Sequence, residues 1–381
     1  MNILMTSWRD RKNPAAGGAE VLTHEIARRL NDRGHKITLI TGRFPGGKEQ
    51  DDDDGVRILR PAYFSPTNAI SYVRWISFLL ATLVTYKREE AGIDVVIEHV
   101  HGLPMLISVF AKKPVFLFPH EVANDIWFME VPFPGNVLGF VLERVYLSLF
   151  RNFPFLVNSP STAADVRAHG IKRIFTITPG ISKPPRTLQP KNPRPTFIVL
   201  GRITPMKRLQ AVVDGVSKLG NRQVLLHIVG GGKPRPVQNL VLYVRKTGMS
   251  GQVRFHGFVG EKRKFDLLSQ SWALLSTSLR EGWGINVLEA ASVGTPTIAY
   301  RVPGIRDSVV NGKTGILVSP NSAALASALQ TFMRDQKLRE SLSRNARSHS
   351  QKFTWDRTTD EFLKAIATVR TKTKEHTPLH Y

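Results

Sequence analysis

Short apolar runs alternate with longer segments of helical periodicity along all 381 residues of the chain. The runs predict buried strands, because strands of a parallel sheet are apolar on both faces. In the first half they cover residues 2–6, 36–41, 56–59, 94–97, 115–118, 155–158 and 174–176, with helical segments such as 19–33 and 162–169 between them. In the second half they cover 196–200, 223–229, 253–256, 273–275, 297–299 and 315–318.

Two successive series of strands and helices predict an α/β protein with two doubly wound, Rossmann-like domains. We expect the first domain over residues 1–183 and the second over 184–354, with a proline-containing hinge at 182–195. The helical pattern at 355–381 is expected to pack back on the first domain. Because open parallel sheets bind ligands beyond the carboxyl ends of their strands, we expect the site in a cleft between the domains.

Positive charge is in large excess, with 53 Lys and Arg against 30 Asp and Glu, a net +23. Residues 1–183 hold 22 basic and 18 acidic side chains, a net +4, whereas residues 184–381 hold 31 and 12, a net +19. This excess favours an anionic partner, although a solvated basic face is the plain alternative. Nucleic acid is less favoured, because the sequence shows no helix-turn-helix, zinc or RNP-type signature.

The absence of cysteine excludes disulfides, cysteine-ligated metal sites and thiol nucleophiles. Charged residues begin at Arg9, too early for the apolar region of a signal peptide. The longest apolar run, 75–86, is shorter than the ~20 residues that a membrane span needs. We therefore expect a cytoplasmic protein, at most peripheral on the cytoplasmic membrane face.

The segment 281–296 (EGWGINVLEAASVGTP) carries the most specific chemistry. Gly282 and Gly284 allow the backbone to approach a ligand closely, and the helix expected after them offers free N–H groups to an anion. Glu281 lies in the loop before that helix and Glu289 lies within it. The two carboxylates therefore suit hydrogen bonds to separate sets of hydroxyl groups rather than paired acid and base catalysis.

Glu281 and Glu289, set in EGWGINVLEA and followed by GTPTIA, resemble the signature of the family-4 retaining glycosyltransferases of the GT-B fold, also described as glycosyl transferases group 1. Further matching segments follow in the order that this family uses: 17–20, 33–37, 159–161, 178–181, 201–207, 229–232 and 255–258. The resemblance implies two Rossmann-like domains facing a cleft and transfer of a sugar from a nucleoside diphosphate.

The resemblance also implies roles for the residues that could do the chemistry. Arg202 and Lys207 would bind the donor diphosphate, and Glu281 would contact hydroxyl groups of the transferred sugar. His120, which ends a predicted strand, would contact the donor sugar and the reaction centre. Departure of a nucleoside diphosphate leaves negative charge on its oxygens, which fixed cations and a helix N-terminus stabilise. The plain alternatives are that Arg202 and Lys207 are surface cations and that His120 is a structural histidine.

Other matching residues are implied to bind the donor. Glu289 would bind the ribose of the nucleotide. Gly17 and Gly18, at the first connection between strand and helix, would bring main chain against the donor phosphate, unless they form a plain turn. The remaining candidates are Gly231 and Phe258, whose loops lie where the base or ribose would be, and Gly284, Ile285 and Asn286 at the start of the helix.

The implied reaction retains the configuration at the anomeric carbon. The departing phosphate would deprotonate the acceptor on the same face, so we assign no side-chain nucleophile. The resemblance implies no metal or other cofactor. The acidic run 51–54 could be taken for a metal-binding DxD motif, but its flanking glycines favour a solvated loop. The segment 307–314 ends like a P-loop, but it lacks the first glycine and favours a turn.

The motifs leave the donor base open between UDP- and GDP-sugars. For the acceptor we expect a saccharide or lipid-linked saccharide, because the segment 70–90 holds an apolar run with Arg74 before it and Lys87 and Arg88 after it. That arrangement suits an anionic membrane surface, while a core helix is the alternative. A second apolar set adjoins His120: Trp127, Phe128, Met129, Val131, Phe133, Val137, Leu138 and Phe140.

Two other classes of function stay open. A nucleotide-sugar hydrolase or epimerase of the same fold would act without an acceptor. A non-catalytic protein would bind saccharide or nucleic acid through its basic surface. The Glu281–Glu289 signature argues against the epimerase. A degenerate, non-catalytic transferase is disfavoured by the presence of all the matching site residues: Gly18, His120, Arg202, Lys207, Glu281 and Glu289.

Overall fold

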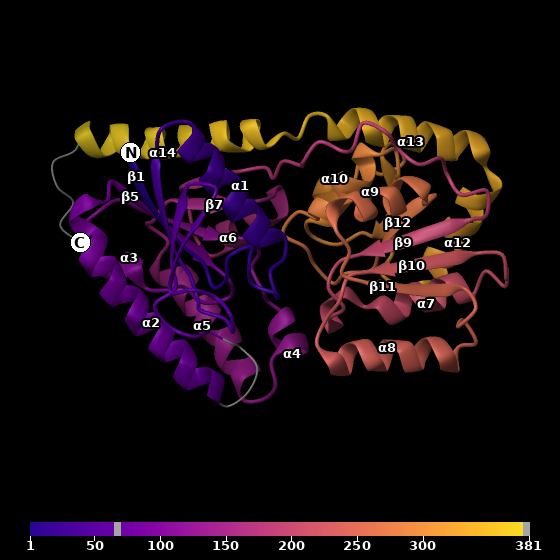
Figure 1. Ribbon diagram of the computed structural model, residues 1–381, viewed down its shortest axis with the longest axis horizontal. Helices are drawn as coiled ribbons and strands as arrows, with labels where there is room; N and C mark the ends of the chain where they lie inside the picture. The colour runs from indigo at the N-terminus through magenta and orange to yellow at the C-terminus, as the bar shows by residue number, and fades with distance from the viewer. Residues whose placement is uncertain (65–69, 376–381) are drawn as a thin grey trace. The chain divides into compact units, whose positions relative to one another are not determined.

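The computed structural model describes residues 1–64 and 70–375, and the side chains of residues 1–64 and 74–370. The chain divides into two compact units (Figure 1). The first comprises Met1–Trp127, Phe133–Gly180 and the chain from Trp355 onward, and the second comprises Phe128–Pro132 and Ile181–Thr354. Each unit contains one sheet.

The sheet of the first unit has eight strands in the order β3-β4-β2-β1-β5-β6-β7-β8. Its strands are β1 (Asn2–Thr6), β2 (Lys36–Ile40), β3 (Gln50–Asp53), β4 (Val56–Leu59), β5 (Val95–Val100), β6 (Val115–Pro119), β7 (Phe155–Val157) and β8 (Ile174–Thr176). Its helices are α1 (Gly18–Asp32), α2 (Ile70–Glu89), η1 (Glu90–Gly92), α3 (Ile107–Phe110), α4 (Ile126–Glu130), α5 (Gly135–Leu149), α6 (Pro160–Ala168) and α14 (Trp355–Glu375). The part of α4 from Phe128 to Glu130 is assigned to the second unit.

The prediction of a solvated loop at residues 51–54 is wrong. Gln50–Asp53 forms β3, an edge strand antiparallel to β4, while the other strand pairs of this sheet are parallel. The strand escaped prediction because it has no apolar residue. Its carboxylates bind cations of the chain: Arg11 donates to Asp53 at 2.7 and 2.8 Å, and Lys12 donates to Asp51 at 3.0 Å.

Arg60, directly after β4, is the cation that fixes this edge of the sheet. Its side chain is fully buried and donates to Asp10 at 2.8 Å and to Asp51 at 3.2 Å. Asp10 lies in the loop between β1 and α1 and is also buried. The pair therefore ties that loop, which ends at Gly17 and Gly18, to the β3–β4 hairpin.

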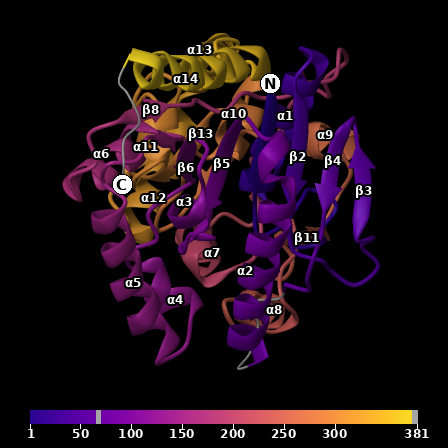
Figure 2. The same cartoon turned by 90° about the vertical axis from the view of Figure 1, so that its left-hand side faces the viewer.

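The C-terminal helix α14 packs on α1 within the first unit (Figure 2). Its buried face consists of Trp355, Phe362, Ala365, Ile366 and Val369. Arg33, directly after α1, donates to Asp360 at 2.6 Å, and the main-chain N–H of Thr178 donates to Glu361 at 2.9 Å. These contacts hold α14 on the first unit.

The second unit has a parallel six-stranded sheet in the order β11-β10-β9-β12-β13-β14. Its strands are β9 (Thr196–Leu200), β10 (Leu225–Val229), β11 (Val253–Gly257), β12 (Ala273–Ser276), β13 (Thr297–Tyr300) and β14 (Gly315–Val318). Its helices are η2 (Pro205–Lys207), α7 (Leu209–Ser217), α8 (Pro234–Lys246), α9 (Glu261–Gln270), α10 (Ile285–Ser292), α11 (Ile305–Ser308), α12 (Ser322–Arg334) and α13 (Gln336–Ser350). This arrangement and that of the first unit confirm the two predicted parallel-sheet domains.

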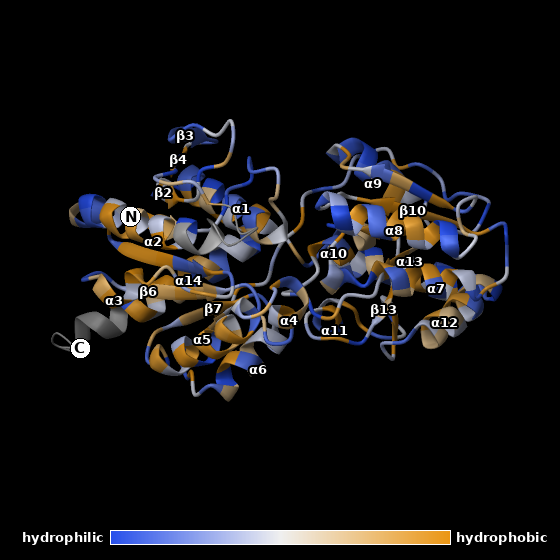
Figure 3. Cartoon of the chain, turned by 90° about the horizontal axis from the view of Figure 1, so that it is seen from below, coloured by the Kyte–Doolittle hydropathy of each residue, from blue (hydrophilic) through white to orange (hydrophobic). Residues whose placement is uncertain are grey.

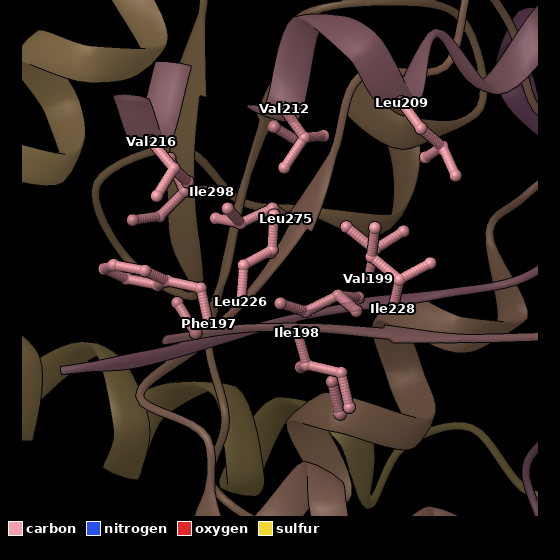
Figure 4. Close-up of a cluster of buried hydrophobic side chains, with 14 of the residues drawn as sticks. Phe197, Ile198, Val199, Leu209, Val212, Val216, Leu226, Ile228, Leu275 and Ile298 are labelled. Atoms are coloured by element: carbon pink, nitrogen blue, oxygen red, sulfur yellow. The ribbon is translucent and has the colours of Figure 1, made fainter. Parts of the chain in front are cut away.

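Aliphatic side chains fill the space between the sheet of the second unit and its helices. Val212 and Val216 of α7 point toward Leu275 of β12 and Ile298 of β13 (Figure 4). β9 lies at the centre of the sheet, where Phe197 and Ile198 are fully buried. Because both faces of β9 are covered, polar groups that could contact a ligand are confined to the loop after its carboxyl end.

We predict that Arg60→Leu lowers the free energy of unfolding of the first unit by about 3–5 kcal/mol, because it leaves the buried Asp10 carboxylate unpaired. Urea unfolding checks this, with hydrogen exchange of β1 and β4 peptides distinguishing the first unit from the second. The control is Arg57→Leu in the same hairpin: Arg57 is half exposed and pairs with Glu89 at 2.7 Å, so we expect less than about 1 kcal/mol. Equal losses in the two variants would contradict the proposed role of Arg60.

Candidate functional site

Three of the predicted donor residues of the second unit, Arg202, Lys207 and Asn286, gather at the carboxyl ends of β9 and β12, which are neighbours in the sheet. A small hollow at this edge is lined by residues of three segments: Leu200, Gly201, Arg202 and Lys207 from the first, Ser276, Thr277 and Ser278 from the second, and Asn286 from the third. The strand order thus brings together loops that lie far apart in the sequence.

Lys207 and Glu281 form an ion pair beside this hollow. The Lys207 Nζ donates to the Glu281 Oε1, and the Ser278 Oγ donates to the same oxygen at 2.6 Å. Both side chains of the pair are largely buried. Two residues with separate predicted roles, one toward the diphosphate and one toward the sugar, are therefore in direct contact.

The turn that carries Lys207 is fixed by β12. The Thr277 Oγ1 donates to the carbonyl oxygens of Lys207 at 2.9 Å and Arg208 at 3.0 Å. Arg208 has a φ of 51°, a left-handed conformation that costs free energy in a residue other than glycine. Since Thr277 holds this strained turn, the backbone position of Lys207 is fixed.

Arg202 lines the hollow without a carboxylate partner: among the residues that the structure describes, it makes no ion pair. Lys207 beside it is compensated by Glu281. The hollow is consequently bordered by an uncompensated guanidinium group, which suits an anion.

Gly284, Ile285 and Asn286 begin α10. Gly284 has a φ of 85°, the left-handed region that favours glycine. The Asn286 Nδ2 donates to the carbonyl oxygen of Leu200 at 2.8 Å, and its Oδ1 accepts from the N–H of Val287 at 3.1 Å. The Asn286 side chain therefore anchors the first turn of α10 to the end of β9.

Glu289 lies one turn further along α10 and is largely buried. The Lys264 Nζ on α9 donates to its Oε1 at 2.7 Å and to Glu261 at 2.5 Å. Burial raises the pKa of Glu289, and the neighbouring ammonium group of Lys264 counteracts that rise. This pairing was not predicted, because in the sequence Lys264 is one of three consecutive basic residues, 262–264, and nothing distinguishes it from the other two.

Gly231 and Phe258 lie against each other. A Cβ atom at Gly231 would lie 2.5 Å from the Phe258 ring, so a larger residue at position 231 would displace that ring. The carbonyl oxygen of Gly231 accepts from the N–H of Ile203 at 2.7 Å. The loop after β10 is thus fixed beside the Gly201–Arg202 loop, and the Phe258 ring, 69% exposed, is accessible to a ligand.

In the first unit, Gly17 and Gly18 lie where α1 begins. The N–H of Gly17 donates to the Glu20 carboxylate at 2.7 Å, and the Arg9 Nε donates to the other oxygen of Glu20 at 3.0 Å. Glu20 is buried. Its carboxylate therefore fixes the conformation of the glycine pair through a hydrogen bond and an ion pair.

His120 directly follows β6 and is buried in a stack of histidine rings. Its Nε2 lies 2.9 Å from the Nδ1 of His99, and the His101 ring centroid lies 5.0 Å from its own. The Asn158 Nδ2 lies 3.2 Å from both the His120 carbonyl oxygen and its Nδ1. The Asn158 NH₂ group donates to the His120 carbonyl oxygen, so it also presents a donor to the Nδ1 of His120. Nδ1 must therefore accept, and the proton of the neutral His120 ring lies on Nε2.

Burial lowers the pKa of His120 to about 4, against a partial opposing effect of the Glu20 charge. Burial also lowers the pKa of His99. The pair is therefore neutral at physiological pH, and the one ring N–H of His120, on Nε2, donates to the Nδ1 of His99 at 2.9 Å. The sequence analysis missed His99 and Asn158; the only signal was their position at predicted strand ends.

The loop after His120 is held by a buried carboxylate. Glu143 of α5 accepts from the N–H groups of Ala123 at 2.7 Å and Asn124 at 2.9 Å, and from the Trp127 Nε1 at 3.1 Å. Three N–H donors compensate this charge in place of a cation. Trp127, the first residue of the apolar set predicted beside His120, is thus hydrogen-bonded to α5 together with the loop before it.

Comparisons with known proteins point to one family. The family described as "Glycosyltransferase Family 4" matches residues 16–183, and the family described as "Glycosyl transferases group 1" matches residues 183–349. The D-inositol 3-phosphate glycosyltransferase of Jonesia denitrificans is 33% identical over 44% of this chain, and the match spans only 41% of that relative. Mannosylfructose-phosphate synthase of Agrobacterium fabrum is 24% identical over 92% of this chain and 86% of its own length.

Solved structures share the fold. Sucrose-phosphate synthase of Thermosynechococcus elongatus has a TM-score of 0.84 at 19% identity, covering 97% of this chain and 99% of its own. HepE of Anabaena, solved in complex with UDP and glucose, has a TM-score of 0.74 at 18% identity and covers 97% and 100%. Since the two family matches together cover residues 16–349 and adjoin at residue 183, this chain belongs to the family-4 glycosyltransferases of the GT-B fold.

Proposed function

We propose that this protein is a retaining glycosyltransferase that moves a hexose-type sugar from a UDP- or GDP-sugar to a saccharide or lipid-linked acceptor. The observation that carries the proposal is the hollow at the carboxyl ends of β9 and β12, bordered by Arg202, which makes no ion pair within the described residues, and by the Lys207–Glu281 pair. UDP in the related fold of HepE supports a nucleotide ligand of this kind.

The proposed reaction breaks the bond between the anomeric carbon and a diphosphate oxygen. A bond from the acceptor oxygen to the same face of that carbon forms, and the acceptor proton passes to the departing phosphate. Lys207 has three N–H donors, so it can keep its bond to Glu281 and still donate to the phosphate. Arg202 and Lys207 then stabilise the charge that develops on the leaving group, while Glu281 orients the sugar.

The alternatives are distinguished by the need for an acceptor. A hydrolase or epimerase would consume the donor alone, and a non-catalytic binder would consume none. We assign no metal, so chelation with EDTA should leave the transfer rate unchanged. We expect the two Glu–Lys pairs and Arg202 to serve a bound nucleotide diphosphate sugar rather than nucleic acid.

Apolar side chains on the surface of the first unit support a lipid-linked acceptor. Ile76, Leu80 and Val84 recur at every fourth position of α2, and each is at least half exposed. The side chains of residues 70–73, which belong to the predicted segment 70–90, lie outside the described residues. α5 also exposes one apolar face (Figure 3), formed by Val137, Leu138, Val141, Leu142, Val145 and Leu149. Exposed apolar faces of this kind are typical of surfaces that bind another protein or a membrane.

Cations adjoin the α2 face. Lys87 and Arg88 end the helix, both exposed, and the Lys87 Nζ donates to the carbonyl oxygen of Phe110, itself exposed at the end of α3. Within the described residues, no helix combines the length and apolarity needed to cross a bilayer. We therefore propose shallow peripheral binding to an anionic membrane on its cytoplasmic face.

The first experiment measures the melting temperature and calorimetric affinity with UDP, GDP, ADP and their sugar conjugates at two salt concentrations. We expect one nucleotide to stabilise the protein at both salts, and its sugar to be transferred with the anomeric configuration retained, as read by NMR. Lys207→Ala should lower the turnover rate at saturating donor by ~10²-fold or more, since it removes a cation from the leaving group.

Lys218→Ala is the matched control: this lysine is exposed at the end of α7, away from the hollow, and its loss should leave the rate unchanged. Stabilisation by every nucleotide at low salt alone would contradict the donor site. An unaltered rate in Lys207→Ala would contradict its role at the leaving group. Consumption of donor without acceptor would favour the hydrolase or epimerase.

We predict that His120 stays neutral between pH 5.5 and 8, because its pKa is about 4. In ¹³C-histidine NMR spectra, the cross-peak that disappears in His120→Gln should keep the shift of neutral imidazole throughout this range. A histidine peptide added to the sample, with a pKa near ~6.5, serves as the titrating control. A midpoint near that of the peptide would show that His120 can act as a cation in the reaction.

We predict that Leu80→Glu combined with Val84→Glu weakens binding to phosphatidylglycerol-containing vesicles about tenfold or more, since burial of each side chain contributes ~1.5–3 kcal/mol. Vesicle sedimentation measures this, with pure phosphatidylcholine as the uncharged reference. Leu242→Glu on α8 is the control, because Leu242 is equally exposed but lies in the second unit. Binding that survives the double substitution would contradict the α2 surface.

A further inference from the structure

Lys264 makes two ion pairs at the back of the predicted ribose site. Its Nζ donates to the Glu289 Oε1 at 2.7 Å and to Glu261 at 2.5 Å. Only 13% of the Lys264 side chain and 18% of the Glu289 side chain are exposed, whereas Glu261 is 71% exposed. The Lys264–Glu289 bond is therefore the enclosed one, and it joins α9 to α10.

This bond leaves one side of the Glu289 carboxylate for a ligand. Oε1 is taken by Lys264, while Oε2 makes no hydrogen bond within the described part of the chain. Two adjacent ribose hydroxyl groups donate in similar directions, so a carboxylate held at one oxygen can accept from them at the other. Orientation of the carboxylate thus depends on the cation behind it.

Lys264 also compensates the charge of Glu289. Burial raises the pKa of Glu289, and the charge of Lys264 lowers it again. The same contact raises the pKa of Lys264 against the opposing effect of burial. Without the lysine, a largely buried carboxylate would lose its partner and would take up a proton or turn toward water.

We infer that Lys264 is a positioning residue for the nucleotide: it fixes the charge and orientation of the Glu289 carboxylate, which then recognises the ribose hydroxyl groups. The inference rests on the proposed function, because it requires Glu289 to bind the ribose. A direct contact of Lys264 with the diphosphate is disfavoured, since its ammonium group is enclosed between two carboxylates.

Lys262 on the same helix supplies a matched comparison. It is 84% exposed and pairs with Asp266 at 2.8 Å, a surface contact of the kind that contributes little. The two lysines share the helix, the charge and the presence of an acidic partner. They differ in burial and in contact with Glu289, which is the feature that the inference concerns.

The test compares the Kd of UDP and GDP with that of their 2′,3′-dideoxy forms in the full-length protein. The wild type should bind the ribose form about tenfold or more tightly than the dideoxy form, the scale of a hydrogen bond to a charged group. Lys264→Met should lose most of this preference while keeping its affinity for the dideoxy form. Lys264→Arg should restore the preference, and Lys262→Met should match the wild type.

The outcomes separate the two proposals. If the wild type binds neither nucleotide, or binds ribose and dideoxy forms equally, the proposed ribose site fails, and this inference fails with it. If the wild type prefers ribose and Lys264→Met keeps that preference, only the role of Lys264 is overturned. Equal weakening toward both forms in Lys264→Met would also overturn it, because such a loss reports on the fold or the phosphates. The melting temperature of each variant shows whether it is folded.

Discussion

A carboxylate taken out of water must be compensated by a cation or by N–H donors, and this requirement shapes the loops of the protein. Asp10 is held by Arg60, Glu281 by Lys207 and Glu289 by Lys264. Each pair joins a loop or helix end to a different element. The compensation therefore fixes the geometry of the loops before a ligand arrives, which is the condition for effective electrostatic stabilisation of a transition state.

Periodicity was sufficient to predict the fold, because the strands are buried on both faces and are consequently apolar. Each predicted strand is present, and the helix pattern after residue 355 corresponds to α14. β3 was missed because its sequence, QDDD, has only polar residues. The strand is stable through pairing with β4 and through Arg11, Lys12 and Arg60, contacts that no local pattern reveals.

The candidate site was predictable only in part, since motifs identify single residues but not their partners. The register of β5 and β6 places His99 opposite Phe118, and this puts His120 within reach of the His99 ring. Lys264 meets Glu289 because α9 packs on α10. Both contacts depend on how separate elements pack, so one sequence alone gave no reason to select His99 or Lys264 over other residues of their type.

Charge at the site and charge of the whole chain act at different distances. Glu281 and Glu289 compensate the charges of Lys207 and Lys264 locally, so we expect long-range attraction of the proposed diphosphate ligand to come mainly from Arg202 and from the general excess of basic residues. Such long-range attraction is screened by salt within about 10 Å at 0.1 M. An enclosed hydrogen bond to a ribose hydroxyl is screened much less. Salt should therefore weaken capture of the nucleotide while leaving the preference for ribose over dideoxyribose largely intact.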